Sequence, residues 1–278
     1  MNPFLQRLRN ACDATGSLVS IGLDPDQERM PIDVLDFNKE IIDATRDLVC
    51  TYKPNVAFYE ALGMPGLEAL RKTIEHIRDV APQVIILGDA KRGDIASTNA
   101  AYAKALFDVW GFDAITVNGF AGGESLEPFF KYEEKGVFVW CRSSNPGSQE
   151  FQDLRVSANG QQPLFYEWMA ERSMDWNTRG NVCLVVGATY PDQLGEVRAR
   201  CPGMPILIPA VGAQGGDLES SVKYGIDSEY PNIIINSSRS IIYAKPGRDD
   251  FAQAARTAAQ NLRDKINRIV KEVGMEWP

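Results

Sequence analysis

The chain contains a single histidine, His76, among its 278 residues. Ser-His-Asp hydrolysis, Cys-His catalysis and metal sites built from several histidines would all have to use this one residue. His76 lies in the segment 66–80, where leucine and isoleucine recur at helical spacing, which indicates a residue on a helix face. Histidine chemistry is therefore not expected.

The cysteines form no CxxC pair, and the chain has no long apolar run. Five thiols scattered in this way are typical of reduced, buried cysteines in a cytoplasmic protein. No apolar stretch reaches the roughly 18 residues that a membrane span needs, and residues 1–16 lack the apolar core of a signal peptide. We expect a cytoplasmic protein with no membrane contact.

Positive charge is in deficit. The chain has 29 Lys+Arg against 37 Asp+Glu, a net charge of −8, which argues against a broad basic surface for nucleic acid. It also lacks the motif GxxxxGK[ST], so binding of a nucleoside triphosphate through a P-loop is not supported. A small anionic ligand stays compatible with this composition, because it needs only a few local positive charges.

What the chain does contain is a series of eight short apolar runs with helical periodicity between them. In one such interval Phe37, Ile41 and Leu48 fall on one helix face. Near-continuously apolar strands that alternate with helices predict a parallel sheet covered by helices. The predicted strands are 18–24, 50–56, 84–90, 114–119, 137–142, 182–188, 205–210 and 232–238.

Two architectures fit this alternation, a closed barrel and an open doubly wound sheet. Polar residues follow most of the predicted strands, and barrel enzymes draw catalytic groups from many strand ends around one rim. We therefore predict an α/β protein with a (β/α)₈ TIM barrel, a single domain over residues 1–278. Residues 3–15 are expected to form an N-terminal capping helix, and about 143–163 an insertion at the rim. No role is assigned to residues 148–162.

The densest charged cluster follows the third predicted strand and contains Asp89, Lys91, Arg92 and Asp94. Asp89 and Lys91 are two residues apart, so in a continuing strand their side chains lie on the same face. Ionised groups at the end of a buried strand are costly unless they are partnered. An isolated pair of this kind would fit a structural salt bridge, but DxKxxD at a strand end favours a functional site.

Neighbouring predicted strands add further charge at the same rim. Lys53 precedes Pro54, which keeps it extended, and a lysine within a parallel strand needs a carboxylate partner or an exit to the barrel mouth. The first predicted strand ends at Asp24. With Asp89 and Lys91 these residues form an alternating array of charges, either a catalytic network or a mutually neutralising structural one.

A possible phosphate site lies elsewhere on the rim. The glycine-rich segment 211–217 follows the seventh predicted strand and opens a helix, and 236–240 follows the eighth. Barrels often bind phosphate through these two loops, where backbone N–H groups favour an anion. Gln214 can donate an amide hydrogen bond and Arg239 can fork onto two phosphate oxygens. The alternative is a tight turn between strand and helix.

These segments carry a resemblance to a known family. GLDPD, YKPN, GDAKRGDIAST, SSNPGS, IPAVGAQGGD and NSSRSIIYA occur in the order and approximate spacing of orotidine 5′-monophosphate decarboxylases. The chain resembles the longer, bacterial-type subgroup from about residue 18 to about residue 245. It has DIAST where many members carry DIPNT, a difference that spares Asp94 and Thr98.

The resemblance implies a carboxy-lyase that converts orotidine 5′-monophosphate to uridine 5′-monophosphate and CO₂, the last step of de novo pyrimidine nucleotide biosynthesis. It implies a homodimer that uses no metal or cofactor. The implied catalytic residues are Lys53, Asp89 and Lys91 of one subunit, with Lys91 protonating the C6 carbanion, and Asp94 from the other subunit. The implied substrate-binding residues are Asp24 and Lys53 at the ribose, Thr98 across the interface, Ser144 or its neighbour Ser143 at the pyrimidine edge, and Gln214 and Arg239 at the phosphate.

Two other functions stay open at this point. Mg²⁺-dependent sugar-phosphate decarboxylases and aldolases share the DxKxxD barrel, but they carry a glutamate where this chain has Lys53, because a metal needs carboxylate ligands. A non-catalytic barrel that binds a phosphorylated metabolite would be expected to have lost part of the charged array, which is complete here. Both observations favour the decarboxylase of orotidylate.

Overall fold

The computed structural model describes residues 1–158, 160–209 and 217–275, and in it eight parallel strands form a closed barrel in sequence order. The last strand pairs with the first, which closes the barrel. The predicted (β/α)₈ barrel is confirmed. The strands are β1 (Val19–Leu23), β2 (Thr51–Pro54), β3 (Ile85–Arg92), β4 (Ala114–Val117), β5 (Gly136–Arg142), β6 (Val182–Val186), β7 (Ile206–Ile208) and β8 (Ile233–Ser237).

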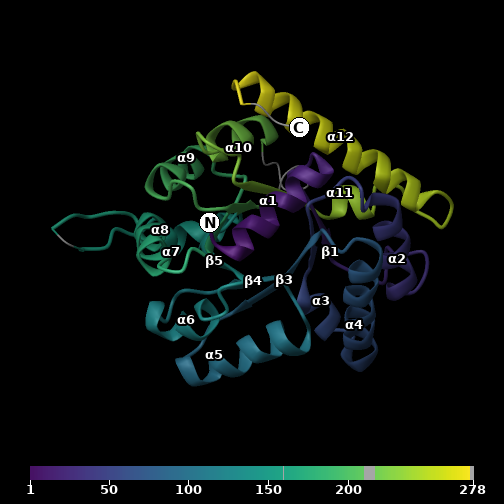
Figure 1. Ribbon diagram of the computed structural model, residues 1–278, viewed down its shortest axis with the longest axis horizontal. Helices are drawn as coiled ribbons and strands as arrows, with labels where there is room; N and C mark the ends of the chain where they lie inside the picture. The colour runs from purple at the N-terminus through teal and green to yellow at the C-terminus, as the bar shows by residue number, and fades with distance from the viewer. Residues whose placement is uncertain (159, 210–216, 276–278) are drawn as a thin grey trace.

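Helices surround the strands (Figure 1). Nearly every strand residue is buried, because the barrel interior covers one side of the sheet and the helices cover the other. The α-helices are α1 (Pro3–Thr15), α2 (Val34–Thr45), α3 (Val56–Glu60), α4 (Gly63–Val80), α5 (Ala96–Ala103), α6 (Gly123–Phe130), α7 (Gln149–Gln152), α8 (Phe165–Trp176), α9 (Pro191–Arg200), α10 (Leu218–Gly225), α11 (Arg239–Ile242) and α12 (Phe251–Glu272). A π-helical turn, Lys104–Val109, extends α5, and a 3₁₀ turn, Pro146–Ser148, precedes α7.

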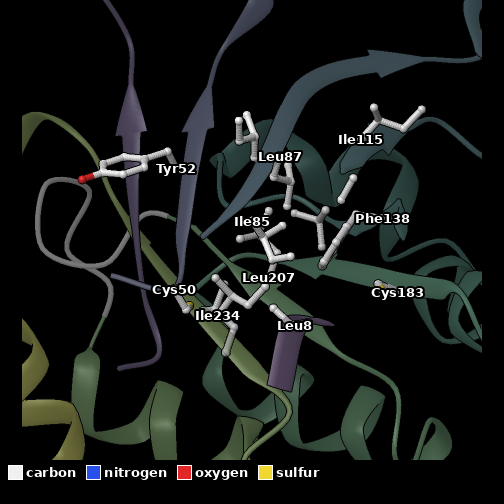
Figure 2. Close-up of a cluster of buried hydrophobic side chains, with 14 of the residues drawn as sticks. Leu8, Cys50, Tyr52, Ile85, Leu87, Ile115, Phe138, Cys183, Leu207 and Ile234 are labelled. Carbon is white, nitrogen blue, oxygen red and sulfur yellow. The ribbon is translucent and has the colours of Figure 1, made fainter. Parts of the chain in front are cut away.

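The core gathers aliphatic and aromatic side chains from most of the strands. Figure 2 shows part of this cluster, in which Leu8 of α1 joins Ile85, Leu207 and Ile234 of three strands. Burying a side chain of this size stabilises the folded state by about 1.5–3 kcal/mol. The hydrophobic core therefore runs without a break from the barrel to the N-terminal helix.

Helix α1 packs at the N-terminal end of the barrel. Asn2 caps it by accepting a hydrogen bond from the Phe4 N–H at 2.7 Å, and donates through its side-chain amide to the carbonyls of Glu133 and Arg179. Phe4 packs edge-on against Phe138 of β5, with ring centroids 6.3 Å apart. Because α1 covers this end, the open end of the barrel is the opposite one, where the strands finish.

The segment between β5 and α8 has two parts. Residues 143–153, here called the anchor segment, include the 3₁₀ turn and α7 and pack near the end of β5. Residues 155–158 and 160–164, here called the arm, form an antiparallel pairing of Arg155 with Leu164 and of Ala158 with Gln161. In Figure 1 the arm extends outward beyond α7 and α8.

The structure shows where the single histidine and the five cysteines lie. His76 lies on α4 and pairs with Asp43 of α2, its Nε2 2.8 Å from Oδ1, on the outer surface of the barrel. All five cysteines are free and buried. Among the helices in the described part of the chain, none is both long enough and apolar enough to cross a membrane.

Candidate active site

The carboxylate of Asp89 joins two lysines at the end of the barrel where the strands finish. Lys53 of β2 donates from Nζ to Oδ2 at 2.7 Å, and Lys91 of β3 donates from Nζ to Oδ1 at 2.6 Å. The side chain of Lys53 is 4% exposed, whereas that of Lys91 is 39% exposed. One lysine is therefore enclosed in the barrel and the other reaches solvent at its mouth.

The charges of this cluster support one another. Burial acts to raise the pKa of Asp89, but Lys53 and Lys91 outweigh it and hold the pKa of this carboxyl well below its usual range. Burial acts to lower the pKa of Lys53, but Asp89 and Asp24 reverse this effect and raise its pKa. Asp89 and Lys53 are therefore both ionised at neutral pH, and each buried charge has a partner.

Thr116 of β4 also belongs to the cluster, although the sequence did not single it out. Its hydroxyl donates to Asp89 Oδ1 at 2.9 Å and accepts from the Lys91 N–H at 2.9 Å. The β3–β4 register shifts between Gly88 and Arg92, and Lys91 has a φ of 45° in the left-handed region. Thr116 therefore links the irregular backbone at Lys91 to the carboxylate that Lys91 contacts. In the sequence it lies in AITV, where a threonine is an ordinary strand residue.

An indole ring borders the same ammonium group. Lys91 Nζ lies 5.7 Å from the ring centroid of Trp140 on β5, a distance at which a cation and an aromatic face attract. Trp140 is only partly buried. Lys91 is therefore held between a carboxylate and an aromatic ring at the open end of the barrel.

Asp24 follows β1 on the same rim. Its Oδ1 is buried and, among the described residues, accepts no hydrogen bond. Its backbone carbonyl accepts from the hydroxyl of Tyr243, which in turn accepts from the Asp26 N–H at 2.8 Å. Because a buried carboxylate oxygen without a donor is costly, this atom marks a place where a ligand hydroxyl would be favourable.

Asp94 lies outside the cluster. Its carboxylate is exposed and accepts from the neighbouring Ile95 N–H at 2.6 Å. Asn99 fixes the loop, because its side chain accepts from the Asp94 N–H and donates to the Asp94 carbonyl. Within the described residues no hydrogen bond or ion pair joins Asp94 to the Asp89 cluster, and Thr98 lies half-buried on α5.

The remaining candidates follow later strands. The carbonyl of Ser144 accepts from the Thr189 hydroxyl at 2.9 Å, which joins the loop after β5 to the loop after β6. Arg239 is exposed and opens α11 directly after β8. Gln214 lies outside the described residues.

The arrangement suits charge stabilisation without a metal ligand set. In residues 1–158, 160–209 and 217–275 no group of three or more His, Cys, Asp or Glu side chains could hold a metal ion. Lys91 presents its side-chain amine at the open end, where Asp89 and Thr116 fix its position. Such a group can stabilise a negative charge that develops beside it and can then donate a proton to it.

The family model, the similar sequences and the similar structures all point to one family. The model of the orotidine 5′-phosphate decarboxylase / HUMPS family matches residues 17–255. A protein of Thermomicrobium roseum named orotidine 5′-phosphate decarboxylase is 51% identical to this chain, over an alignment that covers 97% of each protein. A solved structure of Leishmania donovani OMP decarboxylase superposes with a TM-score of 0.83 at 37% identity, covering 97% of this chain and 98% of that one. The UMP synthase of the same organism gives a TM-score of 0.86 at 39% identity, covering 96% of this chain and 56% of that one.

Proposed function

The chain belongs to the orotidine 5′-phosphate decarboxylase / HUMPS family, and from this premise we propose that it converts orotidine 5′-monophosphate to uridine 5′-monophosphate and CO₂. The observation that carries the proposal is the pair of lysines on one buried carboxylate at the barrel mouth. Lys53 occupies the place where a metal-dependent relative would need a carboxylate. The reaction is the last step of de novo pyrimidine nucleotide biosynthesis.

The chemistry needs electrostatic stabilisation of a carbanion. The bond between C6 and the carboxylate breaks, CO₂ leaves, and the electron pair stays on C6 until a proton from Lys91 Nζ joins it. The ring offers no electron sink such as pyridoxal phosphate supplies, so fixed charges must do this work. Lys91 is held for this role by Asp89 and Thr116, and its exposed side chain can recover a proton from water.

Asp89 adds a second effect. A carboxylate beside the departing carboxylate disfavours the charged substrate more than the transition state, whose charge has moved onto the ring. Two unit charges about 3 Å apart interact by roughly 5–6 kcal/mol at an effective dielectric constant of about 20. The low pKa of Asp89 keeps this charge in place at neutral pH.

The other candidates bind substrate in this proposal. Asp24 and Lys53 hold the ribose hydroxyls, which is supported by the buried Asp24 Oδ1 that lacks a donor among the described residues. Ser144 contacts the pyrimidine edge. The phosphate is held by Gln214 and Arg239, at the loops where barrels often bind this group.

We further propose a cytoplasmic homodimer in which Asp94 and Thr98 complete the site of the other subunit. Among the described residues no hydrogen bond or ion pair joins Asp94 to the Asp89 cluster of its own chain, and the adjacent Ile95 is 64% exposed. On the neighbouring loop Phe120 is 83% exposed. Exposed apolar side chains around a charged residue are typical of an interface, and free, buried cysteines suit a reducing compartment.

The direct test of the function is the loss of orotate-ring absorbance when purified protein is added to orotidine 5′-monophosphate in excess EDTA. We expect stoichiometric formation of uridine 5′-monophosphate, because no step uses a metal. A flat trace with and without added Mg²⁺ would refute the proposal. A trace that falls only with Mg²⁺ would refute the metal-free mechanism.

The phosphate site gives a prediction for Arg239→Ala. Loss of the guanidinium should raise KM for orotidine 5′-monophosphate by about 10–100-fold, since a hydrogen bond to a charged group contributes about 1.5–3 kcal/mol. Steady-state kinetics measure the change, with Arg248→Ala, an exposed arginine beyond α11, as the control. An unchanged KM in Arg239→Ala would place the phosphate elsewhere.

Thr116 gives a second prediction. Thr116→Val keeps the shape of the side chain but removes the hydroxyl that accepts from the Lys91 N–H and donates to Asp89 Oδ1. Because a buried polar group without a hydrogen-bond partner costs about 1–3 kcal/mol, the variant should lower kcat by about 10–100-fold. Thr116→Ser keeps the hydroxyl and should retain most of the activity. Equal losses in both variants would assign Thr116 a packing role only.

A further inference from the structure

Arg142, the last residue of β5, is fully buried and lies at the centre of a polar cluster that the proposed chemistry does not use. Its Nε donates to Gln193 Oε1 at 2.6 Å, and its Nη1 donates to Gln152 Oε1 at 3.1 Å. Its Nη2 lies 3.0 Å from Asp153 Oδ1 in an ion pair. The guanidinium also lies 4.3 Å from the ring centroid of Tyr190, which precedes α9.

Two of these partners, Gln152 and Asp153, belong to the anchor segment. A buried arginine is costly unless it is partnered. Nε and Nη1 of Arg142 have hydrogen-bond acceptors, and Nη2, which makes no hydrogen bond among the described residues, is paired electrostatically with Asp153, so Arg142 and the anchor segment stabilise one another. The network therefore fastens the first part of the insertion to the end of β5 and to α9, which follows β6.

Gln152 connects this network to the serine loop. The same Oε1 that accepts from Arg142 also accepts from the Ser143 N–H at 2.9 Å. On the other side of the loop, Thr189 donates to the Ser144 carbonyl. A Cβ on Gly187 would lie 2.7 Å from Ser144 Cα, so only glycine permits this close approach. Within the anchor segment, Ser143 is thus held by Gln152, and Ser144 is held by the loop after β6.

We propose that Gln152 and Arg142 are positioning residues that fix the Ser143–Ser144 turn for recognition of the pyrimidine ring. The inference rests on the proposed function, in which Ser144 contacts the pyrimidine edge. It assigns the anchor segment a role in nucleobase recognition. The pairing of the arm lies outside this network in the residues that the structure describes, so the inference does not extend to it.

The proposed phosphate residues and Gln152 lie on different loops of the rim. Arg239 opens α11 after β8, whereas Gln152 ends α7 after β5, and within the described residues no hydrogen bond or ion pair joins the two side chains. A nucleotide that carries the pyrimidine should therefore lose affinity when Gln152 is changed. A sugar phosphate that lacks the base should keep its affinity.

The test compares uridine 5′-monophosphate with ribose 5-phosphate as inhibitors of orotidine 5′-monophosphate turnover. Gln152→Met keeps the length of the side chain but removes the acceptor, and should raise the inhibition constant for uridine 5′-monophosphate about tenfold while that for ribose 5-phosphate stays within about twofold. Gln152→Glu keeps an acceptor oxygen and should restore affinity for the nucleotide. Gln162→Met, on the exposed arm, is the matched control and should change neither constant.

Equal weakening of both inhibitors by Gln152→Met, or no change in either, would overturn the inference while wild-type turnover remained. Failure of Gln152→Glu to restore nucleotide affinity would also overturn it. A wild-type protein that leaves orotidine 5′-monophosphate unchanged would overturn the proposed function, and this inference with it.

Discussion

Replacing Lys91 with alanine should lower kcat for orotidine 5′-monophosphate by about 10⁴–10⁷-fold. A positioned proton donor contributes about 10²–10⁴, and a fixed charge at the point where charge develops contributes about 10²–10³. Lys91 performs both tasks in the proposed mechanism, so the two losses multiply. Single-turnover assays with concentrated enzyme would measure the residual rate.

The variant should remain folded. Asp89 keeps its hydrogen bonds to Lys53 and Thr116 when Lys91 is shortened, so no buried charge loses its last partner. The thermal midpoint should therefore change little. Lys72→Ala, on the exposed face of α4, is the matched control and should keep full activity. If the Lys91→Ala protein kept more than a few per cent of the wild-type kcat, the assignment of Lys91 as the proton donor would be wrong.

The barrel could be predicted because its determinants are local and repeated. Eight apolar runs and the helical intervals between them predict the alternation of strands and helices. Polar residues after most of the strands favour a closed barrel, whose active site is built around one rim, over an open sheet that binds its ligand between a few strands. The contact of Asp89 with Lys91 followed from their spacing of two. This contact holds although Lys91 has a left-handed backbone, a feature that no periodicity indicates.

Other parts of the site depend on contacts between segments with no common pattern. Thr116 meets Lys91 only because the β3–β4 register shifts at that point. Arg142 and Gln152 are joined by the fold of an insertion that has no periodicity, and no pattern in its sequence predicts a role for it. A single chain also cannot display a residue supplied by a second copy, and in the proposed dimer Asp94 would be such a residue.

The proposed location of Asp94 predicts a second large effect: activity should be regained when a Lys91→Ala variant and an Asp94→Ala variant are mixed. Lys91→Ala and Asp94→Ala homodimers should each be nearly inactive. If each site takes Lys91 from one subunit and Asp94 from the other, a mixed dimer contains one complete site. Random reassociation makes about half of the dimers mixed, so activity should rise to about a quarter of the wild-type value.

The rise on mixing discriminates between the two locations of Asp94. If Asp94 served the site of its own chain, each subunit of a mixed dimer would lack one essential group, and mixing would restore nothing. The exposed Asp94 carboxylate, beside the exposed Ile95 and away from the Asp89 cluster, leads us to expect the rise. Sedimentation of the mixture should show dimers at the assay concentration. Dimers that reassociate without regaining activity would assign Asp94 to its own chain, and the loop that carries it would then have to move toward Asp89 when substrate binds.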